Sequence, residues 1–265
     1  MKKFIILIPI YNDWKSVFQL LENIDLQIAK WDAEVLVLII NDGSTEERTV
    51  TELSFKNIKT VRVMNMKQNQ GHARCNAAGL KYLTEKEDFD YVILMDGDGE
   101  DRPEELTSLF NKSKENPLKT VTANRIKRSE GSFFKLLYEC HKILTYVFTG
   151  KLIKFGNYSC LPKEDAARLV KEACIWSSFS GSVTKIISDR VSVPSIRGKR
   201  YFGPSQMSFF KLLVHSFSII AVFKGSVIVR SVLFLIFYLF FVSSNLSIVT
   251  LFPVFIIFIF LFLIF

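Results

Sequence analysis

Apolar residues in the first half of the chain run in short, nearly continuous stretches that end in polar residues or glycine. The stretches have the length of β-strands and cover residues 4–10, 34–40, 60–64, 91–95 and 120–124. Helical segments lie between them, for example from Trp14 to Ala29 and from Pro103 to about Lys114. Continuous apolar strands are typical of a parallel sheet with both faces covered. The pattern therefore predicts an α/β fold with a mostly parallel sheet.

Polar side chains follow these predicted strands at the point where each strand ends. They are Asn12 and Asp13, Asp42, Asn69, Asp96 and Asp98, and Arg125. In open sheets of this class, ligands bind beyond the carboxyl ends of the strands. Polar residues at matching ends of several strands therefore predict one ligand site at this edge of the sheet.

The predicted strand at residues 91–95 ends in Asp96, Gly97, Asp98 and Gly99. Residues two apart on an extended chain point the same way, so both carboxylates can face one ion. The two glycines let a bulky ligand come close to the backbone. Two or three carboxylates together with a diphosphate suit Mg²⁺ or Mn²⁺. An acidic turn that only caps the following helix is the alternative interpretation.

The cysteines and the N-terminal segment limit the kinds of protein that the sequence can encode. The net charge is +8, and the four cysteines lie far apart, without a Cys-x-x-Cys pair. This spacing argues against a zinc site or a disulfide framework and fits a reducing compartment. The apolar start of the chain imitates a signal peptide, but it is short and Pro9 interrupts it. We interpret it as the first strand.

The end of the chain has a different composition, because residues 231–265 contain no charged side chain. Two apolar segments, 226–242 and 246–265, are separated by the polar residues 243–245. A bilayer core is spanned by about 20 helical residues. The sequence therefore predicts two membrane crossings joined by a tight turn, with a single long tilted helix as the alternative.

Basic residues ahead of the tail predict its orientation. Lys211, Lys224 and Arg230 flank the first crossing, whereas the turn carries no charge. The positive-inside rule then predicts a multi-pass protein of the cytoplasmic membrane with its catalytic domain in the cytoplasm. Residues 207–223 mix apolar and basic side chains, which predicts an interfacial helix, or else a core helix of the soluble domain. The expected parts are a catalytic domain 1–205, an interfacial helix 206–225 and an anchor 226–265.

Four ordered motifs resemble those of family-2 inverting glycosyltransferases with the GT-A fold. They are Pro9-Ile10-Tyr11-Asn12-Asp13, Asn41-Asp42-Gly43-Ser44, Asn69-x-Gly71-x-Ala73-x-x-Asn76-x-x-Gly79 and Asp96-x-Asp98. The resemblance covers about residues 4–125. It implies metal-dependent sugar transfer from a nucleotide diphosphate sugar with inversion at the sugar. Asn41 stands where the family usually has Asp, and Asp13 stands where Glu is common.

The same resemblance implies roles for individual residues. The metal, Mg²⁺ or Mn²⁺, would be held by Asp96, Asp98 and Glu100. The nucleotide sugar would lie against Pro9, Tyr11, Asn12, Asp13, Asp42, Asn69, Gly71, Arg74, Asp96 and Arg200.

The second half of the chain is similar to the polyprenyl-phosphate subgroup, enzymes like dolichyl-phosphate mannose synthase. The similarity rests on Asn124-Arg125, Arg128-x-Glu130-Gly131, residues 155–161 and Arg200-x-x-Gly203-x-Ser205. It implies that Arg125 and Lys135 contact the acceptor phosphate and that Arg200 reaches the donor phosphates. A solvated surface charge is the alternative for each of these three residues.

Two departures from the subgroup concern Asn157, where Asp is frequent, and Gln206, where Lys is frequent. Asn157 cannot act as a base. A lipid phosphate is already anionic at neutral pH, so its oxygen can attack without one. The catalytic residues expected from the resemblance are Asp96, Asp98, Arg125 and Asn157.

The predicted function is transfer of a sugar to a membrane polyprenyl phosphate. The expected partners are a nucleotide diphosphate sugar, a polyprenyl phosphate and the membrane, without nucleic acid; a homo-oligomer is left open. One alternative is the same fold acting on a glycolipid or a surface polysaccharide. Another is a membrane-tethered nucleotide-sugar binder without catalysis, against which the intact Asp96-x-Asp98 argues.

Overall fold

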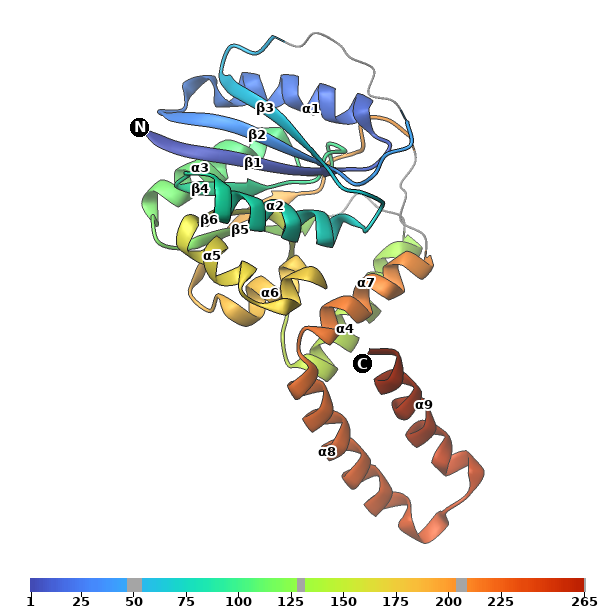
Figure 1. The fold of residues 1–265 in the computed structure, drawn as a ribbon. Helices are drawn as coiled ribbons and strands as arrows, with labels where there is room; N and C mark the ends of the chain where they lie inside the picture. The colour runs from blue at the N-terminus through green and yellow to red at the C-terminus, as the bar shows by residue number, and fades with distance from the viewer. Residues whose placement is uncertain (47–53, 128–131, 204–208, 265) are drawn as a thin grey trace. The chain divides into compact units, whose positions relative to one another are not determined.

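The computed structural model describes residues 1–46, 54–127, 132–203 and 209–264 (Figure 1). The chain divides into two compact units. The first unit comprises residues 1–130 and 154–206, and the second comprises residues 131–153 and 207–265. The described part of the first unit holds a sheet covered by helices, and that of the second unit is helical.

The first unit is built on a seven-stranded sheet with the order β3-β2-β1-β4-β6-β5-β7. The strands are β1 (Lys2–Ile10), β2 (Ala33–Asn41), β3 (Ile58–Asn65), β4 (Tyr91–Leu94), β5 (Thr120–Lys127), β6 (Phe155–Pro162) and β7 (Arg190–Ile196). Strand β6 runs antiparallel to both of its neighbours, and the other described pairs are parallel. The predicted mostly parallel α/β sheet is therefore confirmed.

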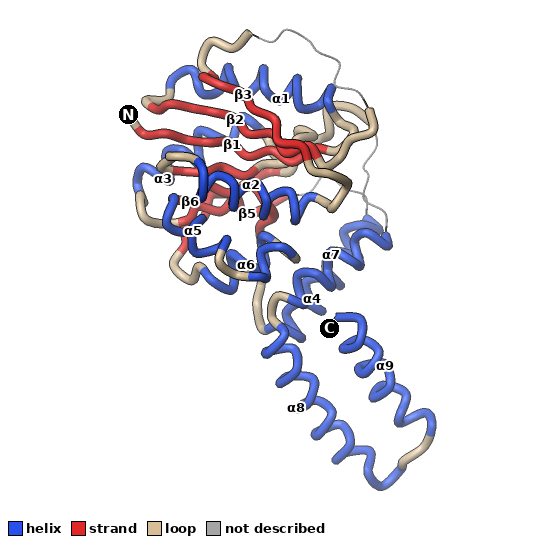
Figure 2. The backbone as a smooth tube through the Cα atoms, viewed as in Figure 1, coloured by secondary structure: helices blue, strands red, loops and turns tan. Residues whose placement is uncertain are grey.

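Helices cover both faces of this sheet (Figures 1 and 2). One face carries α1 (Trp14–Gln27) and α3 (Leu106–Glu115), and the other carries α2 (His72–Lys86), α5 (Lys163–Val170) and α6 (Phe179–Ile186). Phe4 and Ile6 of β1 belong to the core cluster formed with α1 and α3. Leu7 points to the other face, where a Cβ added at Gly79 of α2 would lie 2.5 Å from it. Double coverage explains why the sequences of β1, β2 and β4 are apolar without alternation.

Strand β1 lies between β2 and β4, so the strand order reverses direction beside it. The carboxyl ends of β1 and β4 are adjacent at this point, because the two strands are parallel and paired from Phe4 with Tyr91 to Leu7 with Leu94. A reversal of this kind leaves a crevice in which open α/β sheets bind their ligands. It brings the residues that follow β1 next to those that follow β4.

The second unit contains α4 (Ser132–Thr149), α7 (Phe209–Ala221), α8 (Lys224–Val242) and α9 (Ile248–Ile264). Helix α4 packs on α7 and α8, and α7 and α8 each contact α9. The rings of Phe148 in α4 and Phe260 in α9 lie 4.1 Å apart. The Tyr238 hydroxyl of α8 donates to the Thr250 carbonyl of α9 at 2.8 Å. Helix α4 therefore groups with the C-terminal helices, although in sequence it lies between β5 and β6.

Among the described residues, one helix is long and apolar enough to cross a membrane, at residues 224–245. Helix α9 is more apolar than α8 but shorter. The two helices are separated by a 3₁₀ turn at Ser243–Asn245, so the described tail is not one continuous helix. Most side chains of α8 and α9 are exposed, including Phe240 and Phe262.

Candidate active site

A tight acidic turn, residues 96–101, follows β4 at the switch point. Two of its backbone N–H groups donate hydrogen bonds to two of its own carboxylates. The Asp101 carboxylate accepts from the Asp96 backbone N–H at 3.0 Å, and the Asp98 carboxylate accepts from the Glu100 N–H at 2.9 Å. Gly99 has φ +87°, a conformation that favours glycine. A Cβ at Gly97 would lie 2.8 Å from Ile10, so the turn packs directly on the end of β1.

Crowded carboxylates give the acidic turn an unfavourable concentration of negative charge. Burial raises the pKa of Asp98 to about 6, and the nearby charges of Asp96 and Glu100 act in the same direction. Burial and the charge of Asp96 raise the pKa of Asp101 to about 7. Both shifts mean that negative charge in this turn is poorly solvated. A cation placed here is therefore stabilised.

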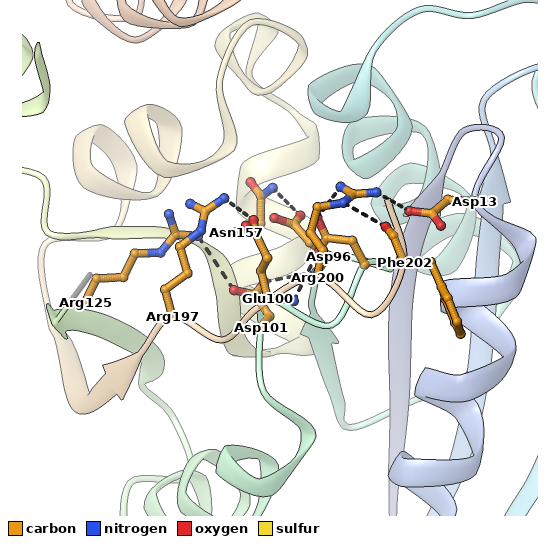
Figure 3. Close-up of polar contacts among 10 residues, drawn as sticks. Asp13, Asp96, Glu100, Asp101, Arg125, Asn157, Arg197, Arg200 and Phe202 are labelled. Carbon is orange, nitrogen blue, oxygen red and sulfur yellow. Dashed lines mark hydrogen bonds and ion pairs between the residues drawn. The ribbon is translucent and has the colours of Figure 1, made fainter. Parts of the chain in front are cut away.

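Among the described residues, three arginines from outside the turn pair with its carboxylates (Figure 3). Arg200 donates to Asp98 at 2.8 Å and to Asp13, at the N-cap of α1, at 2.5 Å. Arg197 pairs with Glu100. Arg125 of β5 lies 3.6 Å from the buried Asp101.

The segment after β7, residues 197–203, is fastened to the acidic turn by its backbone, and we name it the arginine loop. The Gly198 N–H donates to the Glu100 carbonyl at 2.8 Å, and the Tyr201 N–H donates to the Asp98 carbonyl at 3.0 Å. The Tyr201 ring lies against Gly99, where an added Cβ would meet it at 2.6 Å. The Tyr201 hydroxyl accepts from Asn23 of α1 at 2.9 Å. Tyr201 thus links the arginine loop, the acidic turn and α1.

Strand β6 brings Asn157 and Gly156 to the same place. The Asn157 side-chain amide donates to the Asp96 carboxylate at 2.9 Å, as Figure 3 shows. The Arg125 guanidinium packs over Gly156, where a Cβ would lie 2.8 Å from it. The structure therefore brings together Asp96, Asp98, Asn157, Arg125 and Arg200, as the sequence analysis expected.

Other residues expected at the nucleotide site form the loops beside it. Both oxygens of the buried Asp42 accept backbone N–H bonds at 2.7 Å, from Gln70 and Gly71, which tie the end of β2 to the start of α2. Asn12 accepts from the backbone N–H groups of Thr45 and Glu46 and fixes the loop after β2. In this structure both side chains hold backbone, and their role toward a nucleotide stays a prediction.

The remaining expected residues lie in varied settings. Pro9 is buried in β1 opposite Ile40, and Tyr11 is exposed. A Cβ added at Gly43 would lie 2.9 Å from the Asn69 backbone nitrogen, and the exposed Arg74 donates to the Gln70 side chain. Lys135 belongs to α4, but its side chain lies outside the described part of the chain. Arg128, Glu130, Gly131, Ser205 and Gln206 also lie outside the described residues.

The expected metal ligands do not form a three-carboxylate cage. Among the described residues, no three His, Cys, Asp or Glu side chains are placed to share one ion. Glu100 turns to Arg197, and Asp98 turns to Arg200. Mg²⁺ is commonly held by one or two carboxylates together with substrate phosphates. Asp96 and Asp98 therefore fit a metal that arrives with a diphosphate, and Glu100 as a ligand stays a prediction.

The sequence analysis did not single out Asp101, Arg197, Tyr201 or Asn23. Asp101 carried a signal, because it is the fourth carboxylate in the six residues of the acidic turn. Arg197 and Arg200 lie in a loop. Because a loop has no regular periodicity, the sequence does not tell which way the Arg197 side chain points. Asn23 lies on the predicted helix after β1 among core positions, and nothing local connects it with Tyr201.

Comparisons with known proteins find a family model and related enzymes. The sequence model described as glycosyl transferase family 2 matches residues 5–174. The undecaprenyl-phosphate 4-deoxy-4-formamido-L-arabinose transferases of two Klebsiella pneumoniae strains are each 27% identical over 218 residues, which is 80% of this chain and 64% of theirs. The chain thus spans somewhat less than two thirds of the length of these relatives.

Solved structures support the fold. Glucosyl-3-phosphoglycerate synthase from Mycobacterium tuberculosis, in complex with Mn²⁺, UDP-glucose and phosphoglyceric acid, superposes with a TM-score of 0.60 and 13% identity. The match covers 85% of this chain and 80% of that one. The same enzyme with Mn²⁺ and UDP-glucose alone superposes with a TM-score of 0.58 and 12% identity, over 85% of this chain and 79% of that one. At such low identity the likeness concerns the fold alone.

Proposed function

Because the chain belongs to glycosyl transferase family 2, we propose that this glycosyltransferase moves a sugar from a nucleotide diphosphate sugar to a polyprenyl phosphate in the membrane. The observation that carries the proposal is the meeting of Asp96, Asp98, Asn157 and Arg125 at the switch point, in a chain that also has a candidate membrane span. The Klebsiella relatives, named for transfer to undecaprenyl phosphate, support the acceptor class.

The donor side of the proposed site is acidic. Asp96 and Asp98 would hold Mg²⁺ or Mn²⁺ on the donor diphosphate, with Glu100 as a further ligand. The metal would neutralise charge on the leaving nucleoside diphosphate. The Asn157 amide keeps one Asp96 oxygen in place, 2.9 Å away. Arg200 supplies a positive charge beside Asp98, where the donor phosphates would bind.

The acceptor side of the proposed site is basic. Arg125 presents a planar guanidinium, which suits two phosphate oxygens at once. Its pairing with Asp101 at 3.6 Å holds it beside the acidic turn, and Lys135 would be the second contact. The acceptor oxygen is already charged, so Asn157 need not remove a proton. Positioned opposite the leaving diphosphate, that oxygen attacks the anomeric carbon in line, and the sugar inverts.

The second unit would hold the enzyme at its acceptor. Helix α8 is the first proposed crossing and α9 the second, with α7 on the membrane surface. Lys224 and Arg230 lie at the start of α8, which favours the cytoplasmic side for the catalytic unit. A polyprenyl phosphate keeps its phosphate at the headgroups, so an anchored enzyme meets it at high local concentration.

A screen of nucleotide sugars tests the proposal. Full-length enzyme in vesicles with and without undecaprenyl phosphate is given Mn²⁺ or Mg²⁺ and each nucleotide sugar, and released nucleoside diphosphate is measured. We expect release with at least one donor, only when the lipid phosphate is present. The control is Asp98→Asn, in which release should fall about 100-fold or more. Equal release with and without the lipid phosphate contradicts the proposed acceptor, because the sugar would then pass to water or to another lipid of the vesicles.

A further inference from the structure

Arg200 offsets part of the negative charge around the acidic turn. Resting on the proposed function, we propose that Arg200 is the resident counter-ion of the donor site. Its guanidinium leaves Asp98 when the metal enters and moves onto the donor diphosphate. Metal and nucleoside diphosphate therefore bind cooperatively. The metal replaces the guanidinium on Asp98, and the diphosphate gives the guanidinium new acceptor oxygens.

Arg200 is the positive group closest to Asp98 in the described part of the site. Its guanidinium spans Asp98 at 2.8 Å and Asp13 at 2.5 Å, and all three side chains are four fifths or more buried. The other charged neighbours that act on Asp98, Asp96 and Glu100, are negative. Removing the guanidinium would leave a buried carboxylate without compensation, which is costly. Arg200 therefore stays until another cation replaces it.

A metal and the guanidinium cannot share the same Asp98 oxygen, because two positive charges in contact repel. A metal that arrives alone has to displace the guanidinium from Asp98 and leave it with Asp13 and with the Phe202 carbonyl, which lies 3.4 Å from its Nε. A metal that arrives with a diphosphate brings new acceptor oxygens for the displaced guanidinium. The ion pair of Asp98 with Arg200 is then exchanged for two new ones. The exchange predicts positive coupling between the two ligands, and such coupling is reciprocal.

The backbone under Arg200 can stay in place during this exchange. Tyr201 donates its N–H to the Asp98 carbonyl, and Gly198 donates its N–H to the Glu100 carbonyl. The Tyr201 hydroxyl is bonded to Asn23 of α1. None of these bonds involves the guanidinium. A swing of the Arg200 side chain is therefore sufficient, and the arginine loop need not leave the acidic turn.

Metal binding without turnover tests this exchange. Full-length protein in detergent is titrated with Mn²⁺, alone and with saturating UDP or GDP, and free Mn²⁺ is measured by electron paramagnetic resonance. We expect nucleotide to tighten Mn²⁺ binding to the wild type by about fivefold or more. Arg200→Ala should bind Mn²⁺ alone about fivefold more tightly than the wild type, and nucleotide should add less. Arg200→Gln, which keeps hydrogen-bond donors but no charge, should change in the same direction.

The matched control is Arg102→Ala. It removes the same charge next to the acidic turn, but from a partly exposed side chain whose partner is Glu104 at 3.4 Å. Its Mn²⁺ affinity should stay within twofold of the wild type. The exchange is overturned if Arg200→Ala and Arg200→Gln bind Mn²⁺ alone no more tightly than Arg102→Ala, and lipid-dependent turnover would still support the proposed function. Absence of Mn²⁺ binding in every variant, with and without nucleotide, overturns both the exchange and the metal in the proposed function.

Discussion

Replacing Gly99 with alanine tests whether Tyr201 rests on the acidic turn as the structure has it. Gly99 has φ +87°, which costs an alanine about 1–2 kcal/mol. Its new Cβ would also lie 2.6–2.8 Å from three atoms of the Tyr201 ring. The ring is held through its hydroxyl by Asn23, so it cannot simply turn away. Overpacking of this kind adds about 1–3 kcal/mol, and the total loss of unfolding free energy is about 2–5 kcal/mol.

Gly203→Ala is the matched control, because Gly203 has φ +68° but no atom of the described residues lies within 4 Å of an added Cβ. It should lose only the backbone part, about 1–2 kcal/mol. Urea unfolding in detergent, followed by tryptophan fluorescence, measures both losses. All three tryptophans, Trp14, Trp31 and Trp176, lie in the first unit, so the signal reports on that unit. The Mn²⁺–nucleotide complex should also bind Gly99→Ala more weakly than Gly203→Ala. Equal losses in the two variants would refute the seating of Tyr201 on Gly99.

Three further predictions address turnover, the acceptor and pH. Asp98→Asn should lower turnover about 100-fold or more while the fold is kept, because it removes a proposed metal ligand without changing shape; near-normal rates with saturating metal would exclude that role. Arg125→Ala should raise the Michaelis constant for the lipid phosphate about tenfold and leave donor affinity unchanged; the reverse result would mean that the two sites are exchanged. Burial raises the pKa of Asp25, but backbone N–H bonds from Ile58, Asn57 and Lys56 outweigh it and leave the pKa below its ordinary 3.8. The stability contributed by Asp25 is therefore complete above about pH 4 and is lost as the pH falls through the folded-state pKa. Urea unfolding between pH 2 and 7 should show a steeper acid loss in the wild type than in Asp25→Asn, and parallel curves would refute this account.

The sheet and the acidic turn were predictable because the physics behind them is local. Strands buried on both faces must be apolar throughout, as residues 4–10 and 34–40 are. A parallel sheet must also place the residues after its strands at one edge, which brings Asp13 and Asp98 together. Strands β6 and β7 were less visible. Strand β6 carries the polar residues Asn157 and Ser159 among its apolar ones, and β7 alternates buried and exposed positions and contains Pro194.

The partners of α4 could not be predicted from its sequence. Its apolar stripe was plain, but such a stripe packs equally well on a sheet or on other helices. In the structure α4 packs on α7 and α8. The Arg230 side chain of α8 reaches the Val147 carbonyl at the end of α4. In sequence, α4 lies between β5 and β6 of the sheet. Only its three-dimensional contacts show that it belongs to the second unit.

The ion pairs of the candidate site could also not be predicted from the sequence. The motifs indicated that Asp98, Glu100 and Arg200 belong to one site, and the structure brings them together. They did not indicate that Arg200 would bridge Asp98 and Asp13, because the pairing depends on the path of the chain after β7. They also gave no reason for Glu100 to face Arg197. Long-range contacts of this kind decide which carboxylates are available to a metal.

The acceptor is the central claim, and its product tests it most directly. Purified full-length enzyme in vesicles containing undecaprenyl phosphate is incubated with Mn²⁺ and a radiolabelled nucleotide sugar chosen by the screen, and the lipids are extracted with chloroform. The account predicts label in a chloroform-soluble product that mild acid releases as free sugar, because a sugar joined to a phosphate through its anomeric carbon is acid-labile. Label that appears without the lipid phosphate, or that stays attached to lipid or polymer after mild acid, would contradict it.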